Sequence, residues 1–192
     1  MQPEQVLAEF QDTGALLHGH FELRSGLHSD QYFQCALVLQ HPRLAERLCS
    51  ALAGMVRERL GAAYRPGAVI SPALGGIPVG HELGRAFNVR AIFAEKQDGR
   101  LVMRRAFEVR PGEHFLVAED VVTRGGRVHE VMNIVRERGG IVDGVAVLVD
   151  RSAGHFACER PVIPLLQLAP VTWAPAECPL CRTGQPVQHP GS

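Results

Sequence analysis

The chain has 192 residues and equal numbers of basic and acidic side chains, 20 of each, so its formal net charge is zero. This length fits one domain with an ordinary core, and the balanced charge argues against nucleic acid or a membrane surface as a partner, because such proteins usually carry a basic excess. Residues 1–17 lack the basic start of a signal peptide, and no apolar run is long enough to span a bilayer, so we expect a cytoplasmic protein.

The first part of the chain has apolar residues at helical spacing. A first helix is predicted by the positions of Val6, Leu7, Phe10, Leu16 and Leu17. Residues 19–33 follow, and they can form two short strands joined by Ser25-Gly26. Pro42 then opens a second helix, which Gly61 ends.

Strands and helices alternate from residue 68 onward. The expected elements are strands over 68–71, 89–94, 115–118 and 141–149, and helices over 78–87 and 128–137. This order predicts an α/β fold, in which a central parallel sheet is flanked by helices and ligands bind at the carboxyl ends of the strands.

The most informative stretch is 114–127, HFLVAEDVVTRGGR, in which an apolar strand leads into two acids and a glycine turn before a helix. A strand-turn-helix junction offers backbone N–H groups and a positive helix end to a phosphate, and Gly125-Gly126 let the backbone come close. Glu119 and Asp120 would repel a phosphate unless hydroxyl groups of the same ligand separate the charges. A ribose 5-phosphate has both parts.

Other interpretations of this stretch fit less well. The spacing is wrong for a Walker A loop and no G-x-G-x-x-G is present, which disfavours a nucleoside triphosphate or a dinucleotide. An exposed strand end followed by an ordinary turn explains each piece but not their order. The stretch resembles the phosphoribosyl diphosphate (PRPP) signature of type I phosphoribosyltransferases.

A second segment narrows the family. Residues 21–33, FELRSGLHSDQYF, resemble the F-x-L-x-S-G-x-x-S-x-x-Y-F element of orotate phosphoribosyltransferases, which other type I members lack. The resemblance implies one phosphoribosyltransferase domain over residues 1–192, with a small hood partly from 1–40 and a tail over 170–192. It also implies transfer of the 5-phosphoribosyl group from PRPP to orotate, which yields orotidine 5'-phosphate and pyrophosphate in pyrimidine (UMP) biosynthesis.

The resemblance also implies roles for individual residues. The catalytic residues would be Asp120, Lys96 and Glu119, and Mg²⁺ would arrive with PRPP and water, without a direct protein ligand. The orotate contacts would be Tyr32, Phe33, Thr123 and Arg151. A planar guanidinium can donate in pairs to a carboxylate, although a structural Asp150-Arg151 turn is the alternative. The residues that would bind PRPP are Arg24, Leu74, Gly75, Lys96, Arg100, Glu119, Asp120, Val121, Val122, Thr123, Arg124, Gly125, Gly126 and Arg127.

Two departures from the family pattern concern charge. Many orotate enzymes have a lysine where this chain has Gly75, so another base must supply that cation. In the stretch 95–105, which corresponds to the family's mobile loop, only Lys96 matches cleanly, and Arg100 can substitute for a missing cation. Arg104 and Arg105 are equally consistent with a solvated polar hairpin. Because the family's loop usually acts from the neighbouring subunit, we expect a homodimer with the loop near Lys96 acting across the interface.

The cysteines form an odd set without a secretory context, which favours reduced thiols; they are Cys35, Cys49, Cys158, Cys178 and Cys181. Cys178 and Cys181 are spaced like a zinc ligand pair, but a full site needs four ligands, and the obvious candidates to complete it are Cys158, His155 and His189. A structural or incidental thiol pair, a zinc site and redox chemistry are the three interpretations, and the Pro-rich tail disfavours the last.

Two rival functions stay open. A phosphoribosyltransferase for another nucleobase would keep the stretch 114–127 but should lack the element at 24–33. A PRPP-sensing regulator of the same fold that binds RNA or DNA would need a strongly basic surface patch. The zero net charge and the absence of an added DNA-binding domain count against that regulator.

Overall fold

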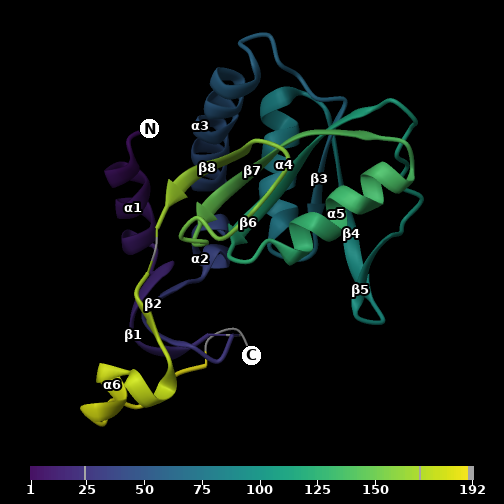
Figure 1. Ribbon diagram of the computed structural model, residues 1–192. Coiled ribbons are helices and arrows are strands. Elements are labelled where there is room, and N and C mark those ends of the chain that lie inside the picture. Colours follow the sequence, from purple (N-terminus) through teal and green to yellow (C-terminus); the bar gives the residue numbers. More distant parts are fainter. Residues whose placement is uncertain (24, 169, 190–192) are drawn as a thin grey trace.

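A computed structural model describes residues 1–23, 25–168 and 170–189 (Figure 1). Its main sheet has six strands in the order β5-β4-β3-β6-β7-β8. These strands are β3 (Ala68–Pro72), β4 (Arg90–Gln97), β5 (Arg100–Met103), β6 (His114–Val122), β7 (Ile141–Asp150) and β8 (Val162–Gln167). All neighbours pair in parallel except β5, which runs antiparallel to β4 at the edge. The carboxyl ends of β3, β6 and β7 therefore meet at one edge of the sheet.

Helices cover both faces of the main sheet (Figure 1). One face carries α3 (Pro42–Leu60), which packs on β7 and β8, and α4 (Gly76–Phe87), which packs on β3, β4 and β6. The residues of α1 (Pro3–Asp12) and the short α2 (Cys35–Leu39) extend this layer. The opposite face carries α5 (Gly126–Glu137). The predicted parallel sheet flanked by helices is confirmed. Within the described residues, none of the helices is both long and apolar enough to cross a membrane.

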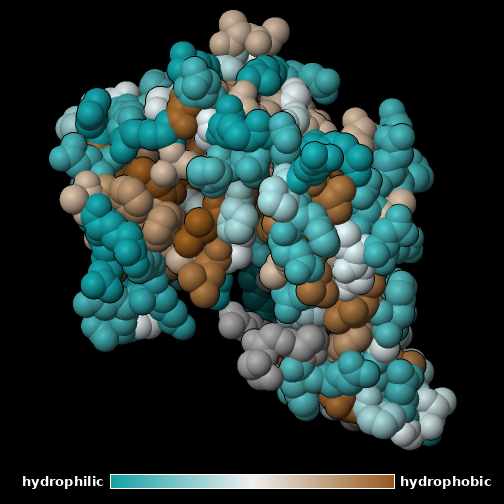
Figure 2. Space-filling view, turned by 180° about the vertical axis from the view of Figure 1, so that it is seen from behind, coloured by the Kyte–Doolittle hydropathy of each residue, from teal (hydrophilic) through white to brown (hydrophobic). Residues whose placement is uncertain are grey.

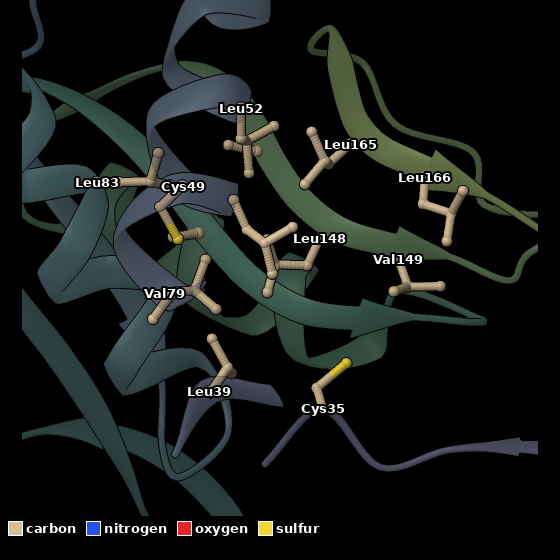
Figure 3. Packing of buried hydrophobic residues seen from close by; sticks show 14 of the residues in the cluster. Cys35, Leu39, Cys49, Leu52, Val79, Leu83, Leu148, Val149, Leu165 and Leu166 are labelled. Atoms are coloured by element: carbon tan, nitrogen blue, oxygen red, sulfur yellow. The ribbon is translucent and has the colours of Figure 1, made fainter. Parts of the chain in front are cut away.

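Apolar side chains between the sheet and the α3–α4 layer form the larger core (Figure 3). Leu148 of β7, Leu52 of α3, and Val79 and Leu83 of α4 are all fully buried in it. Burial of one such side chain stabilises the fold by roughly 1.5–3 kcal/mol. The core therefore fixes the strands whose carboxyl ends carry the predicted site.

A second sheet, of order β1-β2-β9, lies at one end of the α/β body. The strands β1 (Leu16–Glu22) and β2 (His28–Phe33) form an antiparallel hairpin, and β9 (Thr172–Trp173) adds the other end of the chain to β2. A 3-10 turn (Pro175–Glu177) and α6 (Pro179–Arg182) follow β9. We call these elements together the hood. Figure 2 shows the hood as a projecting lobe.

The helices confirm one prediction and correct another. The helix expected from Pro42 to Gly61 is present, with Leu48, Leu52 and Val56 buried at helical spacing. The first helix is shorter than predicted, because it ends at Asp12 and residues 16–17 belong to β1. Gly14 separates the two elements with φ +68°, a left-handed conformation that favours glycine and stops a helix.

Two strands run further than predicted. Strand β4 continues past residue 94 to Gln97 and pairs with β5, so the polar loop expected after it begins as a hairpin. Strand β6 continues to Val122, so Glu119 and Asp120 lie within the strand and not after it. The apolar run underestimates both strands because charged residues interrupt it before the strand ends, Glu95-Lys96 in β4 and Glu119-Asp120 in β6.

Candidate active site

The end of β6, the turn after it and the first turn of α5 enclose a cavity of about 220 Å³. Gly125 is the N-cap of α5, and no side chain caps this end, so the first N–H groups and the positive end of the helix dipole are open to an anion. The cavity is lined by Glu119, Asp120, Val121, Val122, Thr123, Gly125, Gly126, Arg127 and Val128. The structure therefore brings together the predicted residues of this stretch except Arg124, which is exposed and does not line the cavity.

The turn is shaped by close contact with an aromatic ring. Gly125 has φ +73°, and a Cβ on it would lie 2.1 Å from two carbon atoms of the Phe156 ring, so a larger residue does not fit without a shift. Phe156 also packs edge to face on His129 of α5, with ring centroids 5.4 Å apart. Phe156 is not among the site residues predicted from the sequence, because no local pattern signals a contact between positions 125 and 156.

The neighbouring acids have different surroundings. Glu119 is only 4% exposed, and its Oε1 accepts the N–H of Asp120 at 3.2 Å. Burial raises the pKa of Glu119 well above its ordinary value, and the side chain of Asp120 raises it further. Asp120 is half-buried, and its Oδ1 accepts the N–H of Val121 at 2.9 Å. Asp120 is thus the more accessible carboxylate of the cavity.

The turn after β3 lies against Asp120. A Cβ on Gly75 would approach Asp120 Oδ2 to 2.4 Å, so glycine allows the two segments to touch. The N–H of Ala73 donates to the carbonyl of Ala94 at 2.8 Å, which ties the turn to β4, and the side chain of Leu74 is 80% exposed. The turn therefore brings Gly75 against Asp120.

A second cavity, of about 130 Å³, is lined by Ala73, Lys96, Gly99, Leu101, Arg127 and Glu130. Arg127 lines both cavities, so the two adjoin. Lys96 is the only lysine of the chain. The N–H of Leu101 donates to Glu130 Oε2 at 2.9 Å, which holds the β4–β5 hairpin against α5. Lys96 and Arg127 therefore form a basic edge beside the first cavity, which we call the phosphate cavity after the ligand that the sequence predicts for it.

The other basic residues of the hairpin lie elsewhere. Arg105 forms an ion pair with Glu95, and its Cζ lies 5.9 Å from the centroid of the Phe93 ring, so it braces the hairpin. Arg100 and Arg104 are exposed and line neither cavity. These contacts favour the structural interpretation of Arg105 over a role in binding.

Tyr32, Phe33 and Arg151, three of the four predicted orotate contacts, lie close together where β7 ends, whereas Thr123 lines the first cavity. The Cζ of Arg151 lies 5.3 Å from the centroid of the Phe33 ring, and Tyr32 precedes Phe33 in β2. Among the described residues, the buried Nε of Arg151 has no hydrogen-bond partner, and burial lowers the pKa of the guanidinium. A buried donor of this kind fits an acceptor on a ligand. Arg24, the remaining predicted contact from this segment, lies outside the described residues.

Cys35 connects the segment after β2 with the acid pair of β6. Its thiol is buried directly after β2 and lies 4.0 Å from the Asp120 carbonyl oxygen, within the range of an S–H donor. Burial raises the pKa of this thiol well above its ordinary value, so it stays a neutral side chain. The contact sets the end of the hood hairpin against the acid pair, and sequence analysis assigned Cys35 no such role.

Comparisons with known proteins agree with this geometry. A family model described as a phosphoribosyl transferase domain matches residues 37–180. The orotate phosphoribosyltransferase of Heliobacterium modesticaldum is 50% identical over 192 residues, which cover 100% of this chain and 99% of that protein. The orotate phosphoribosyltransferase of Pelotomaculum thermopropionicum is 49% identical over 192 residues, with 100% and 98% coverage.

Solved structures show the same fold. The crystal structure of orotate phosphoribosyltransferase from Aeropyrum pernix superposes with a TM-score of 0.70 at 24% identity, over 85% of this chain and 93% of that one. The Mycobacterium tuberculosis enzyme in complex with inorganic phosphate gives a TM-score of 0.63 at 25% identity, over 88% and 98%. With near-complete relatives at about half identity and this arrangement of residues, the chain belongs to the orotate phosphoribosyltransferase family.

Proposed function

We propose that the protein transfers the 5-phosphoribosyl group of PRPP to orotate and releases pyrophosphate, a step in the synthesis of UMP. The observation that carries this proposal is the contact between Arg151 and Phe33, because it joins the hood to the sheet edge that holds the phosphate cavity. Relatives named orotate phosphoribosyltransferase match the whole chain, which supports the same reaction.

The two cavities correspond to the two ends of PRPP. The 5-phosphate fits the first turn of α5, where Thr123 and Gly126 line the cavity and backbone N–H groups are free to donate. Asp120 then faces the ribose hydroxyls, which accept and donate hydrogen bonds and keep its charge away from the phosphate. The pyrophosphate lies toward the basic edge formed by Lys96 and Arg127.

The reaction exchanges one bond at the ribose C1. The bond to the pyrophosphate oxygen breaks, its electron pair leaves with pyrophosphate, and a ring nitrogen of orotate forms the new bond to C1. Positive charge develops on the ribose in between, and the accessible carboxylate of Asp120 stabilises it, with the buried Glu119 as its neighbouring acid. Lys96 and Arg127 stabilise the departing anion. Orotate carries a carboxylate and a readily ionised ring nitrogen, so the reaction needs no dedicated histidine base.

Magnesium fits this donor set. It prefers oxygen ligands and keeps several waters, so the accessible carboxylate of Asp120 can hold it through water and the ribose hydroxyls. When bound, it neutralises charge on the diphosphate of PRPP. A homodimer whose β4–β5 hairpin acts across the interface, and a cytoplasmic location, complete the proposal as inferences from the family resemblance.

Loss of orotate absorbance tests the function directly. Purified protein is mixed with PRPP and Mg²⁺, and orotate is compared with uracil, adenine, hypoxanthine and xanthine as acceptors. We expect turnover with orotate alone and only when Mg²⁺ is present. Turnover of another base would keep the PRPP site but contradict the substrate, and no turnover with any base would favour a PRPP-sensing regulator.

Arg151→Ala is expected to raise the KM for orotate by about 10–100-fold, because a buried charged donor contributes roughly 1.5–3 kcal/mol to binding. The KM for PRPP should change far less, since Arg151 does not line the phosphate cavity. Initial rates at varied orotate and fixed saturating PRPP measure the effect.

Arg151→Lys is the matched control for that change. It keeps the positive charge but loses the planar pair of donors, so it should restore only part of the affinity for orotate. Thermal melting shows that both variants are folded. An unchanged KM for orotate in Arg151→Ala would remove this residue from the site.

A further inference from the structure

Four potential metal ligands lie close together in the hood. Two come from the start of the chain and two from a segment about 150 residues later. They are His20 of β1, His28 at the start of β2, Cys178 at the N-cap of α6 and Cys181 within α6. Their ligand atoms all lie within 4.8 Å of one another. The residues that the sequence suggests as further ligands beside Cys178 and Cys181 are not in this cluster. Cys158 lies instead 3.8 Å from the sulfur of Met132, and His189 lies 3.6 Å from a carboxylate oxygen of Glu22.

We propose that His20, His28, Cys178 and Cys181 bind one Zn²⁺ as a structural Cys₂His₂ site. Four side-chain ligands of these types close a tetrahedral zinc shell and leave no open position for a substrate, which distinguishes a structural from a catalytic zinc. Cys178 and Cys181 have the C-x-x-C spacing of such sites. The histidines are eight positions apart in the sequence, but they lie on adjacent strands of a hairpin and are therefore close in space.

The distances match a tetrahedron around one ion. With bonds of about 2.3 Å to sulfur and 2.0 Å to nitrogen, the ligand atoms of a tetrahedral zinc site lie roughly 3.3–3.8 Å apart. Cys178 Sγ and Cys181 Sγ lie 3.5 Å and 3.6 Å from His20 Nε2, and Cys181 Sγ lies 3.3 Å from His28 Nδ1. The two imidazole nitrogens are closer, 2.8 Å apart, which is a hydrogen-bond distance, so binding an ion requires the rings to separate by about 0.5 Å.

A hydrogen bond to the backbone fixes the orientation of the His20 ring. Its Nδ1 lies 2.7 Å from the carbonyl oxygen of Gln185, which can only accept, so Nδ1 carries the proton. In the neutral ring, Nε2 therefore presents its lone pair to the two sulfurs. Hydrogen bonds of this kind from the second ring nitrogen to a carbonyl fix the tautomer and the ring plane of zinc-bound histidines.

Three of the four side chains are buried, which distinguishes this cluster from a chance group of surface residues. His20 and Cys178 are 0% exposed and His28 is 5% exposed, whereas Cys181 lies at the outer side. Buried polar groups need partners, and one ion bound by all four side chains would satisfy them together. Both thiols are free, so no Cys178–Cys181 disulfide occupies the position.

The hood has a structural need for a crosslink. Its sheet has three strands, β9 contributes only two residues, and the strands project from the α/β body (Figure 1). A hairpin with so short a third strand needs further contacts to be stable, and a bound metal can supply part of that stability. A zinc here would join the hairpin of residues 16–33 to the segment 178–181. It would thereby fix β2, whose far end carries Tyr32 and Phe33.

Metal content tests the proposal on the full chain without a polyhistidine tag. Protein made in zinc-supplemented medium and purified without chelators should contain about one Zn²⁺ per chain by elemental analysis. Cys178→Ser and Cys181→Ser should each lose most of it. Cys158→Ser is the matched control, since Cys158 lies outside the cluster, and it should keep its zinc.

Two measurements on the unmutated chain keep the test independent of variants that fail to fold. A strong chelator should release the zinc, expose two further thiols to a thiol reagent and lower Tm by roughly 5 °C or more. Refilling with Co²⁺ should give the visible bands of a tetrahedral site together with thiolate-to-cobalt charge transfer. Zinc-free protein with free thiols, a Cys178–Cys181 disulfide after reducing purification, or undiminished zinc in Cys178→Ser would overturn the proposal.

Discussion

Asp120→Asn is expected to lower kcat by about 10²–10³-fold, the range found when one preorganised electrostatic group is removed from a transition state. The amide keeps the shape of the side chain, and its oxygen can still accept the N–H of Val121, so the fold should not change. It removes the accessible negative charge beside the ribose. Steady-state rates with saturating PRPP and orotate measure the loss, and thermal melting should show a Tm close to that of the unmutated protein.

A remote aspartate gives the matched control for this change. Asp12 is exposed at the end of α1, so Asp12→Asn makes the same chemical change away from both cavities and should leave kcat unaltered. The KM values separate two roles for Asp120. A loss confined to kcat indicates an interaction made in the transition state, whereas a rise confined to the KM for PRPP would show that Asp120 only binds the ground state. Full activity in Asp120→Asn would contradict the assignment.

Lys96→Ala should lower kcat by about 10²-fold, because the cation opposite the leaving pyrophosphate would be lost while Arg127 remains. Lys96 is exposed on the hairpin and is not one of the buried core residues of the described chain, so the fold should tolerate the change. Rates of orotate consumption and of pyrophosphate release measure the effect.

The composition of the chain permits a second, mutation-free test of Lys96. Because it is the only lysine, an amine-selective reagent can modify only this side chain and the N-terminal amine. Pyrophosphate should slow the modification of Lys96, followed by mass spectrometry, and leave the N-terminus unaffected. Arg100→Ala is the comparison variant, since Arg100 lines neither cavity and its loss should change kcat only a few-fold. Equal losses in both variants would point to the general charge of the hairpin.

The sequence predicts the body of this protein better than its hood. Apolar periodicity locates α3, β6 and α5 because each buries a continuous stripe against its neighbours, and the order of strands and helices implies which strand ends meet. It misplaces Leu16–Leu17, because two leucines satisfy a helical or an extended pattern equally, and only Gly14 decides between them.

The site, too, has a part that the sequence predicts well and a part that it does not. The residues from Glu119 to Arg127 are adjacent in the chain, so a local pattern identifies almost all of them. The contacts of Phe156 with Gly125 and of Cys35 with Asp120 join distant segments, and no local pattern encodes them. The partners of Cys178 illustrate the point most clearly. Nearby histidines and cysteines were the natural candidates, yet the fold supplies His20 and His28 from the opposite end of the chain.

The contact between Gly75 and Asp120 restricts how this site can change by mutation. A side chain at position 75 begins with a Cβ only 2.4 Å from the carboxylate oxygen, so a lysine introduced there would displace the acid that it is meant to assist. Exchange to the lysine that many orotate enzymes carry therefore requires the side chain of Asp120 to move away from position 75. The β3 turn and the acids of β6 are coupled in this way, so a change at one of them alters the geometry of the other.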